Sequence, residues 1–179
     1  MASTDLRTRS KRAYERSRMH LGLRAALPVI PTVALSMYAC GRPALTLSAG
    51  VLLFATVAWL RARGQAYGRA VMPGAIAGLA PLVLPLALRS SGHCCIGGAC
   101  WPACMLACVG GGLFAGIALG FTAASQREDS TAFLLCATWV AGLVGALGCA
   151  MAGTAGMFGM MIAICATSLP MTLVARSRA

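Results

Sequence analysis

The feature that most constrains this chain is a series of six apolar stretches, each close to the length of a helix that crosses a bilayer. A transmembrane helix needs roughly 20 consecutive, predominantly apolar residues. Because only short polar links separate the stretches, no soluble domain fits between them. The sequence therefore predicts one all-α, polytopic membrane domain of six transmembrane helices, at about residues 21–40, 44–60, 70–88, 102–125, 131–152 and 156–175.

The composition agrees with a membrane protein. Hydrophobic residues make up 59% of the chain and charged residues 11%, whereas about a quarter of a typical soluble domain is charged. The formal net charge of +11 raises the question of nucleic-acid binding. However, the basic residues occur in the links and near the two termini, as membrane topology requires. We therefore expect the lipid bilayer as a partner and no nucleic acid.

The positions of arginine and lysine predict the orientation. If the N-terminus is cytoplasmic, thirteen basic residues lie on the cytoplasmic side and only Arg42 and Arg89 on the other. Cytoplasmic segments carry such an excess of basic residues. The prediction is a bacterial inner-membrane protein with a basic cytoplasmic segment at 1–20 and a cytoplasmic tail at 176–179. A cleaved signal peptide is the competing interpretation, but the next apolar stretch begins at Ala44 and leaves almost no ectodomain.

The stretch at 92–108 reads GHCCIGGACWPACMLAC and includes the link between the third and fourth helices, which faces outside in this topology. Seven of the nine cysteines then lie at or near the outer face. An oxidising periplasm favours disulfides, although reversible redox sensing and unpaired thiols are alternatives. Sequence alone leaves the pairing open. The disulfide or redox candidates are Cys40, Cys94, Cys95, Cys100, Cys104, Cys108 and Cys149.

A soft-metal site is a second interpretation of the same loop, because thiolate and imidazole ligands suit zinc, copper(I) and mercury(II). In the last helix, Met157, Met161 and Cys165 recur every four residues, as ligands along a copper(I) path would. Ordinary packing of a Met-rich helix is the simpler account. The metal candidates are His93, Cys94, Cys95, Cys100, Cys104, Met157, Met161 and Cys165. We expect no cofactor other than such an ion.

Glycines at regular spacing predict where helices approach one another. Gly112, Gly116 and Gly120 recur every four residues in the fourth helix, which favours close packing inside the bundle over dimerisation. A second set predicts close packing between the fifth and sixth helices. It comprises Gly142, Gly145, Gly148, Gly153, Gly156 and Gly159.

The sequence places no group for acid–base catalysis or ion transport near the centre of a predicted span. The four acidic residues all fall in predicted cytoplasmic segments, and no ionisable side chain other than cysteine occupies the centre of a span. Ionisable residues inside a membrane are the usual mark of proton and ion routes. We therefore expect neither an enzyme nor an ion-coupled pump.

The layout resembles the six-span bacterial anti-sigma regulators of the NrsF type, through its cytoplasmic N-terminus and its outward cysteines, Cys94 or Cys95 and Cys149. The resemblance implies stress sensing by those cysteines and a cytoplasmic regulatory protein, a sigma factor, held through residues 1–20. The adjacent pair Cys94 and Cys95 also resembles mercuric-ion transport proteins, which place such a pair in a membrane helix. Our leading hypothesis is a non-enzymatic sensor or regulator with a periplasmic disulfide or redox-active cysteine cap. Binding or transport of a soft metal, mercury or copper, is the alternative.

Overall fold

A computed structural model describes residues 2–40, 43–90, 100–126, 130–149 and 153–177. All regular secondary structure in this part of the chain is helical. Six segments are long and apolar enough to cross a membrane, and the first of these, Tyr14–Tyr38, runs through α1 and α2. The predicted all-α protein with six membrane-spanning helices is confirmed. The helices are α1 (Ala2–Ala26), α2 (Val29–Cys40), α3 (Pro43–Arg63), α4 (Gln65–Ser90), α5 (Cys100–Ala124), α6 (Ser130–Cys149) and α7 (Gly153–Ser177).

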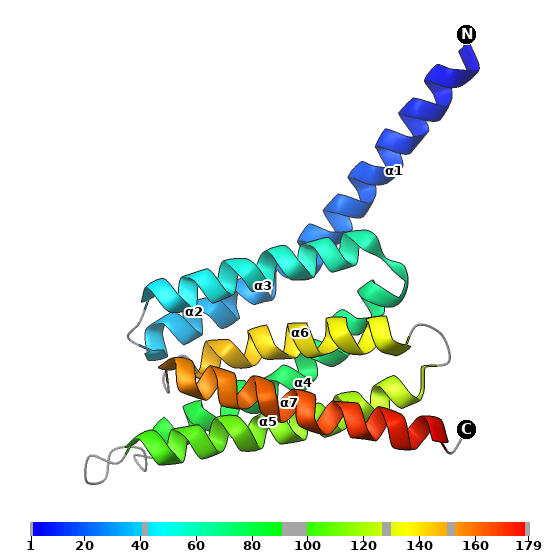
Figure 1. Ribbon diagram of the computed structural model, residues 1–179. Coiled ribbons are helices and arrows are strands. Elements are labelled where there is room, and N and C mark those ends of the chain that lie inside the picture. Colours follow the sequence, from blue (N-terminus) through cyan, green and yellow to red (C-terminus); the bar gives the residue numbers. More distant parts are fainter. Residues whose placement is uncertain (1, 41–42, 91–99, 127–129, 150–152, 178–179) are drawn as a thin grey trace.

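Successive spans run in alternating directions, so the bundle has two distinct ends (Figure 1). The cysteine end carries the helix termini at Cys40, Cys100 and Cys149. The opposite, basic end carries Arg63 at the end of α3 and Arg69 near the start of α4. α1 projects away from the basic end, and α7 also finishes there (Figure 1). Both terminal helices therefore emerge on one side of the bundle.

The first span differs from the single helix expected over 21–40. α1 already begins at Ala2, and the helix is interrupted between α1 and α2 by a turn at Leu27 and Pro28. Proline has no N–H group and cannot continue the i→i−4 ladder. The backbone N–H of Leu27 instead donates to the carbonyl of Arg24 at 3.3 Å, three residues back. The basic N-terminal segment is thus helical and continuous with the start of the span.

The boundaries of two links also differ from those that the sequence indicated. Between α3 and α4, the expected link over 61–69 contracts to Gly64, whose φ of 68° is in the left-handed region that glycine tolerates. α7 begins at Gly153, with φ of 74°, although a turn was expected through 153–155. Helix α4 continues through Pro73, Pro81 and Pro85. Neighbouring helices make such prolines tolerable in a membrane helix.

Two helix pairs dominate the packing, α4 with α6 and α5 with α7. A Cβ atom added to Gly74 or Gly78 of α4 would lie 2.6 or 2.8 Å from a carbonyl oxygen of α6. Glycine therefore allows these two backbones to approach closely. α6 is central and largely buried, and α1 and α2 pack mainly against α3 as an outer layer.

The regularly spaced glycines of α5 face α7 within the same chain. Added Cβ atoms at Gly112 and Gly116 would lie 2.8 and 2.6 Å from carbonyl oxygens of α7. One at Gly120 would lie 2.5 Å from the Cβ of Met171, also in α7. These contacts match the expected use of the three glycines in packing inside the bundle.

The glycines of α6 act differently from the expectation of direct contact with α7. The sulfur atom of Met161 packs against Gly142, and that of Met160 packs against Gly145. Thioether side chains therefore fill the space between these two helices. Gly148 faces the backbone of α4 instead. The distance between α6 and α7 is thus set by methionine side chains rather than by backbone contact.

Candidate functional site

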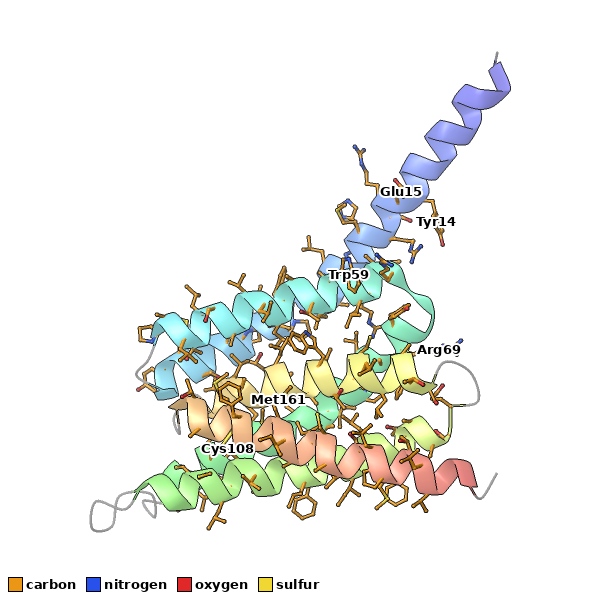
Figure 2. The ribbon with its side chains drawn as sticks, in the orientation of Figure 1. Tyr14, Glu15, Trp59, Arg69, Cys108 and Met161 are labelled. Atoms are coloured by element: carbon orange, nitrogen blue, oxygen red, sulfur yellow. A yellow bond between two sulfur atoms is a disulfide. The ribbon has the colours of Figure 1, made fainter. Side chains whose placement is uncertain are left out.

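A disulfide between Cys108 and Cys149 joins α5 to α6 near the cysteine end of the bundle. The two Cα atoms are 6.0 Å apart, within the usual range for disulfides. Cys149 is the last residue of α6, whereas Cys108 lies two turns into α5. Both residues are fully buried. Figure 2 shows Cys108 toward the cysteine end of the bundle and Arg69 at the opposite, basic end.

The sulfur of Cys149 also lies near two groups on other helices. It is 3.7 Å from the thioether sulfur of Met160 in α7 and 3.9 Å from the carbonyl oxygen of Pro81 in α4. Met160 is itself fully buried. Four helices, α4 to α7, therefore meet around this one sulfur atom.

The carbonyl of Pro81 lacks its normal helical partner. In an α-helix it would accept a hydrogen bond from the residue four positions later, but that residue is Pro85, which has no N–H group. Both prolines are fully buried. A buried acceptor without a donor costs free energy, on the order of 1–3 kcal/mol. In the disulfide, Cys149 has no proton to donate, whereas a reduced thiol would have one.

Glycines bring the neighbouring helices onto Pro81. A Cβ atom at Gly111 of α5 would lie 2.6 Å from the Cα of Pro81. One at Gly148 of α6 would lie 2.8 Å from its carbonyl oxygen. The backbone of α4 at Pro81 is therefore in close contact with both helices that the disulfide joins.

The sequence-predicted candidates are distributed over described and undescribed parts of the chain. His93, Cys94 and Cys95 lie outside the described residues, as do the side chains of Cys40 and Cys100. Of the seven disulfide or redox candidates, the side chains of Cys104, Cys108 and Cys149 are described. Cys104 is buried one turn before Cys108 and belongs to the same core cluster. The disulfide therefore joins two helical residues, Cys108 from the cysteine-rich stretch and Cys149 at the end of α6.

The three soft-metal candidates in α7 do not share one environment. Met157 and Met161 are half-buried against the core, and Cys165 is exposed on the surface of the bundle. No cluster of three or more His, Cys, Asp or Glu side chains occurs among the described residues. Soft-metal transport through these three residues stays a prediction.

Neither Met160 nor Pro81 was predicted from the sequence to belong to this site. The four-residue spacing of Pro81 and Pro85 was the available signal, because it removes the partner of one carbonyl. The proximity of this carbonyl, that of Pro81, to Cys149 depends on helix packing and could not be inferred from the spacing of the prolines.

Comparisons with known proteins do not extend this description, because no family model, curated protein or solved structure matches the chain. The geometry of Cys108, Cys149, Met160 and Pro81 is therefore the basis on which a function is assigned.

Proposed function

We propose that the chain is a non-enzymatic membrane regulator whose Cys108–Cys149 pair responds to thiol–disulfide conditions and whose helix α1 transmits that response. The observation that carries the proposal is the disulfide itself, which ties the α5–α7 pair to the α4–α6 pair. The predicted orientation would place this pair on the periplasmic side and α1 in the cytoplasm.

The chemistry is a two-electron exchange. A small dithiol reductant would transfer two electrons and two protons to the Cys108–Cys149 bond, giving two thiols and becoming a disulfide itself. The reverse reaction would need an external disulfide as oxidant. Since both sulfur atoms are buried, the exchange requires a local opening between α5 and α6. The rate of exchange would therefore report on helix packing.

The carbonyl of Pro81 offers a way for the redox state to influence α4. After reduction, the thiol of Cys149 could donate to this carbonyl, from which it is 3.9 Å away in the disulfide form. The link between α5 and α6 would be lost at the same time. Both changes would act on α4 where Gly111 and Gly148 contact it. Two discrete arrangements of packed helices are the usual basis of such switches.

Helix α1 has the properties of a cytoplasmic output. Its base is attached to α3: Gly22 contacts the backbone of α3 at Ala58, and the guanidinium of Arg18 donates to the carbonyl of Arg63. Beyond this point α1 leaves the bundle (Figure 1). α3 in turn contacts both α4 and α6. A rearrangement of α4 would therefore reach the base of α1 through α3, and a basic helix suits an acidic surface on a cytoplasmic regulatory protein.

The test is limited trypsin digestion of inside-out membrane vesicles, with the disulfide state checked by thiol alkylation and gel shift. Reduction is expected to change the rate of cleavage in α1, near Arg16 and Arg18, by about threefold or more. A threefold change corresponds to a shift of roughly 0.7 kcal/mol in the local opening equilibrium of the helix. The double substitution Cys108→Ser/Cys149→Ser should remove the response. Cys165→Ser, at an exposed cysteine, should leave it intact.

Two results would reject the proposal. One is a disulfide that remains oxidised under every condition that leaves the vesicles intact, which would make it a static cross-link. The other is identical cleavage of α1 in the oxidised and reduced protein, which would separate the disulfide from the predicted output.

A further inference from the structure

A cavity of about 220 Å³ lies away from the disulfide, between the α1–α2 break and helices α3, α4 and α6. Its deep wall consists of buried apolar side chains, including Leu53 and Val57 of α3 and Val140 of α6. Its rim includes Met72 and Ile76 of α4, which are exposed on the surface of the bundle. The cavity is therefore bordered by the membrane-facing surface of α4.

One end of this apolar cavity is cationic. Arg61, in the last turn of α3, is the charged residue among those that line it. The Nε atom of Arg61 is buried and has no hydrogen-bond partner among the described residues. A buried guanidinium nitrogen without an acceptor is unfavourable, and a phosphate or carboxylate would satisfy it with a charge-assisted hydrogen bond.

The surroundings of Arg61 favour an anion. Arg24 and Arg69 do not line the cavity but are exposed at the same, basic end of the bundle, on the segments that carry the lining residues Ala25 and Val71. Glu15 is the single carboxylate among the described side chains, and it lies on the part of α1 outside the bundle (Figure 2). The positive charge at this end of the cavity is therefore not neutralised by a nearby described carboxylate.

The dimensions indicate the class of ligand. Leu53 and Arg61 lie eight residues apart in α3, which corresponds to about 12 Å along the helix axis. One leaflet of a bilayer contributes about half of a 30 Å hydrocarbon core, or about 15 Å. The cavity thus has one cationic end, at the basic end of the bundle, and an apolar length close to the depth of one leaflet.

We propose that this cavity is a binding site for an anionic phospholipid, with the phosphate on Arg61 and one acyl chain along Val57 and Leu53. An inorganic anion would leave the apolar part unfilled, and a neutral lipid would leave the positive charge uncompensated. Basic pockets between membrane helices bind anionic headgroups on this principle. The site is separate from the Cys108–Cys149 pair and does not depend on the proposed redox role.

The test uses the full-length protein in vesicles of phosphatidylcholine and phosphatidylglycerol, extracted with a mild detergent. The retained lipids are then quantified by mass spectrometry. Arg61→Gln is expected to reduce the ratio of retained phosphatidylglycerol to phosphatidylcholine about fivefold. Both lipids carry a phosphate, but only phosphatidylglycerol has a net negative charge, and one basic residue attracts such a lipid by about 1 kcal/mol. Arg63→Gln is the matched control, because Arg63 does not line the cavity. Its guanidinium carbon lies instead 4.6 Å from the centre of the Trp59 ring. It should change the ratio less than twofold.

A second pair of variants tests the acyl-chain part. Ala75→Leu fills the cavity from α4, whereas Ala87→Leu adds the same volume at an exposed position of the same helix. Only Ala75→Leu should lower retention. Formation of the Cys108–Cys149 disulfide in each variant verifies that the bundle has folded. Equal losses in Arg61→Gln and Arg63→Gln, or displacement of the lipid by inorganic phosphate, would overturn the proposal.

Discussion

Gly111→Ala is expected to destabilise the protein, whereas Gly110→Ala, one residue earlier, is expected to be neutral or stabilising. A Cβ atom at Gly111 would lie 2.6 Å from the Cα and 2.8 Å from the nitrogen of Pro81. Both are backbone atoms, so the contact can be relieved only by moving α4 relative to α5. Overpacking of this kind costs about 1–3 kcal/mol.

Gly110 is the matched control, because no atom lies within 4 Å of the position its Cβ would occupy. Alanine is the better helix former, so Gly110→Ala should gain up to about 0.5–1 kcal/mol. The two variants have identical composition and differ by one position in one helix. Any difference between them therefore reports on the contact with Pro81.

The measurement is reversible unfolding in mixed detergent micelles, followed by circular dichroism. Gly111→Ala should unfold at a lower fraction of denaturing detergent than the wild type, and Gly110→Ala at the same fraction or a higher one. If both variants lose stability equally, the prediction that α5 and α4 are in close contact at Pro81 is wrong. That result would also remove the route by which the disulfide is proposed to influence α4.

The fold could be predicted from sequence because the bilayer imposes one dominant requirement. A helix that crosses the apolar core must satisfy its backbone hydrogen bonds internally, so apolar length alone indicates spans. The largest departure was in the first span, where Pro28 interrupts the helix and α1 extends back to Ala2. Local hydrogen bonding decided that boundary, and hydropathy does not report it.

The candidate site was less predictable because it depends on which helix faces meet. Cys108 and Cys149 were two of seven candidate cysteines, and their pairing requires α5 to pack beside the end of α6. The contact between Cys149 and Pro81 adds a third helix, and the two residues are 68 positions apart in the sequence. Composition pointed to the cysteine-rich stretch at 92–108 as a whole. It did not single out Cys108 within that stretch or Cys149 as its partner.

Removal of the disulfide should produce the second large change in stability. The bond joins residues separated by 41 positions, and the chain-entropy relation gives a stabilisation of about 4 kcal/mol for such a loop. This is an upper bound, because helices that stay inserted in the detergent micelle restrict the unfolded chain. We expect Cys108→Ala/Cys149→Ala to lose about 2–4 kcal/mol relative to the oxidised wild type.

Unfolding in mixed micelles with and without a phosphine reductant measures this effect. The reductant should lower the stability of the wild type and leave the double variant unchanged. Cys165→Ala provides the control, because this exposed cysteine lies outside the cluster and should retain the full response to reductant. A double variant as stable as the oxidised wild type would show that the disulfide does not stabilise the fold.

The reduced state permits a finer test of the carbonyl of Pro81. The variants Cys108→Ala/Cys149→Ser and Cys108→Ala/Cys149→Ala both lack the disulfide, but only serine can donate a hydrogen bond from position 149. Since Pro85 leaves the carbonyl of Pro81 without its helical donor, the serine variant should be more stable by about 1 kcal/mol. If serine is no better than alanine, the carbonyl does not depend on residue 149. Reduction would then act on the bundle only through the lost cross-link between α5 and α6.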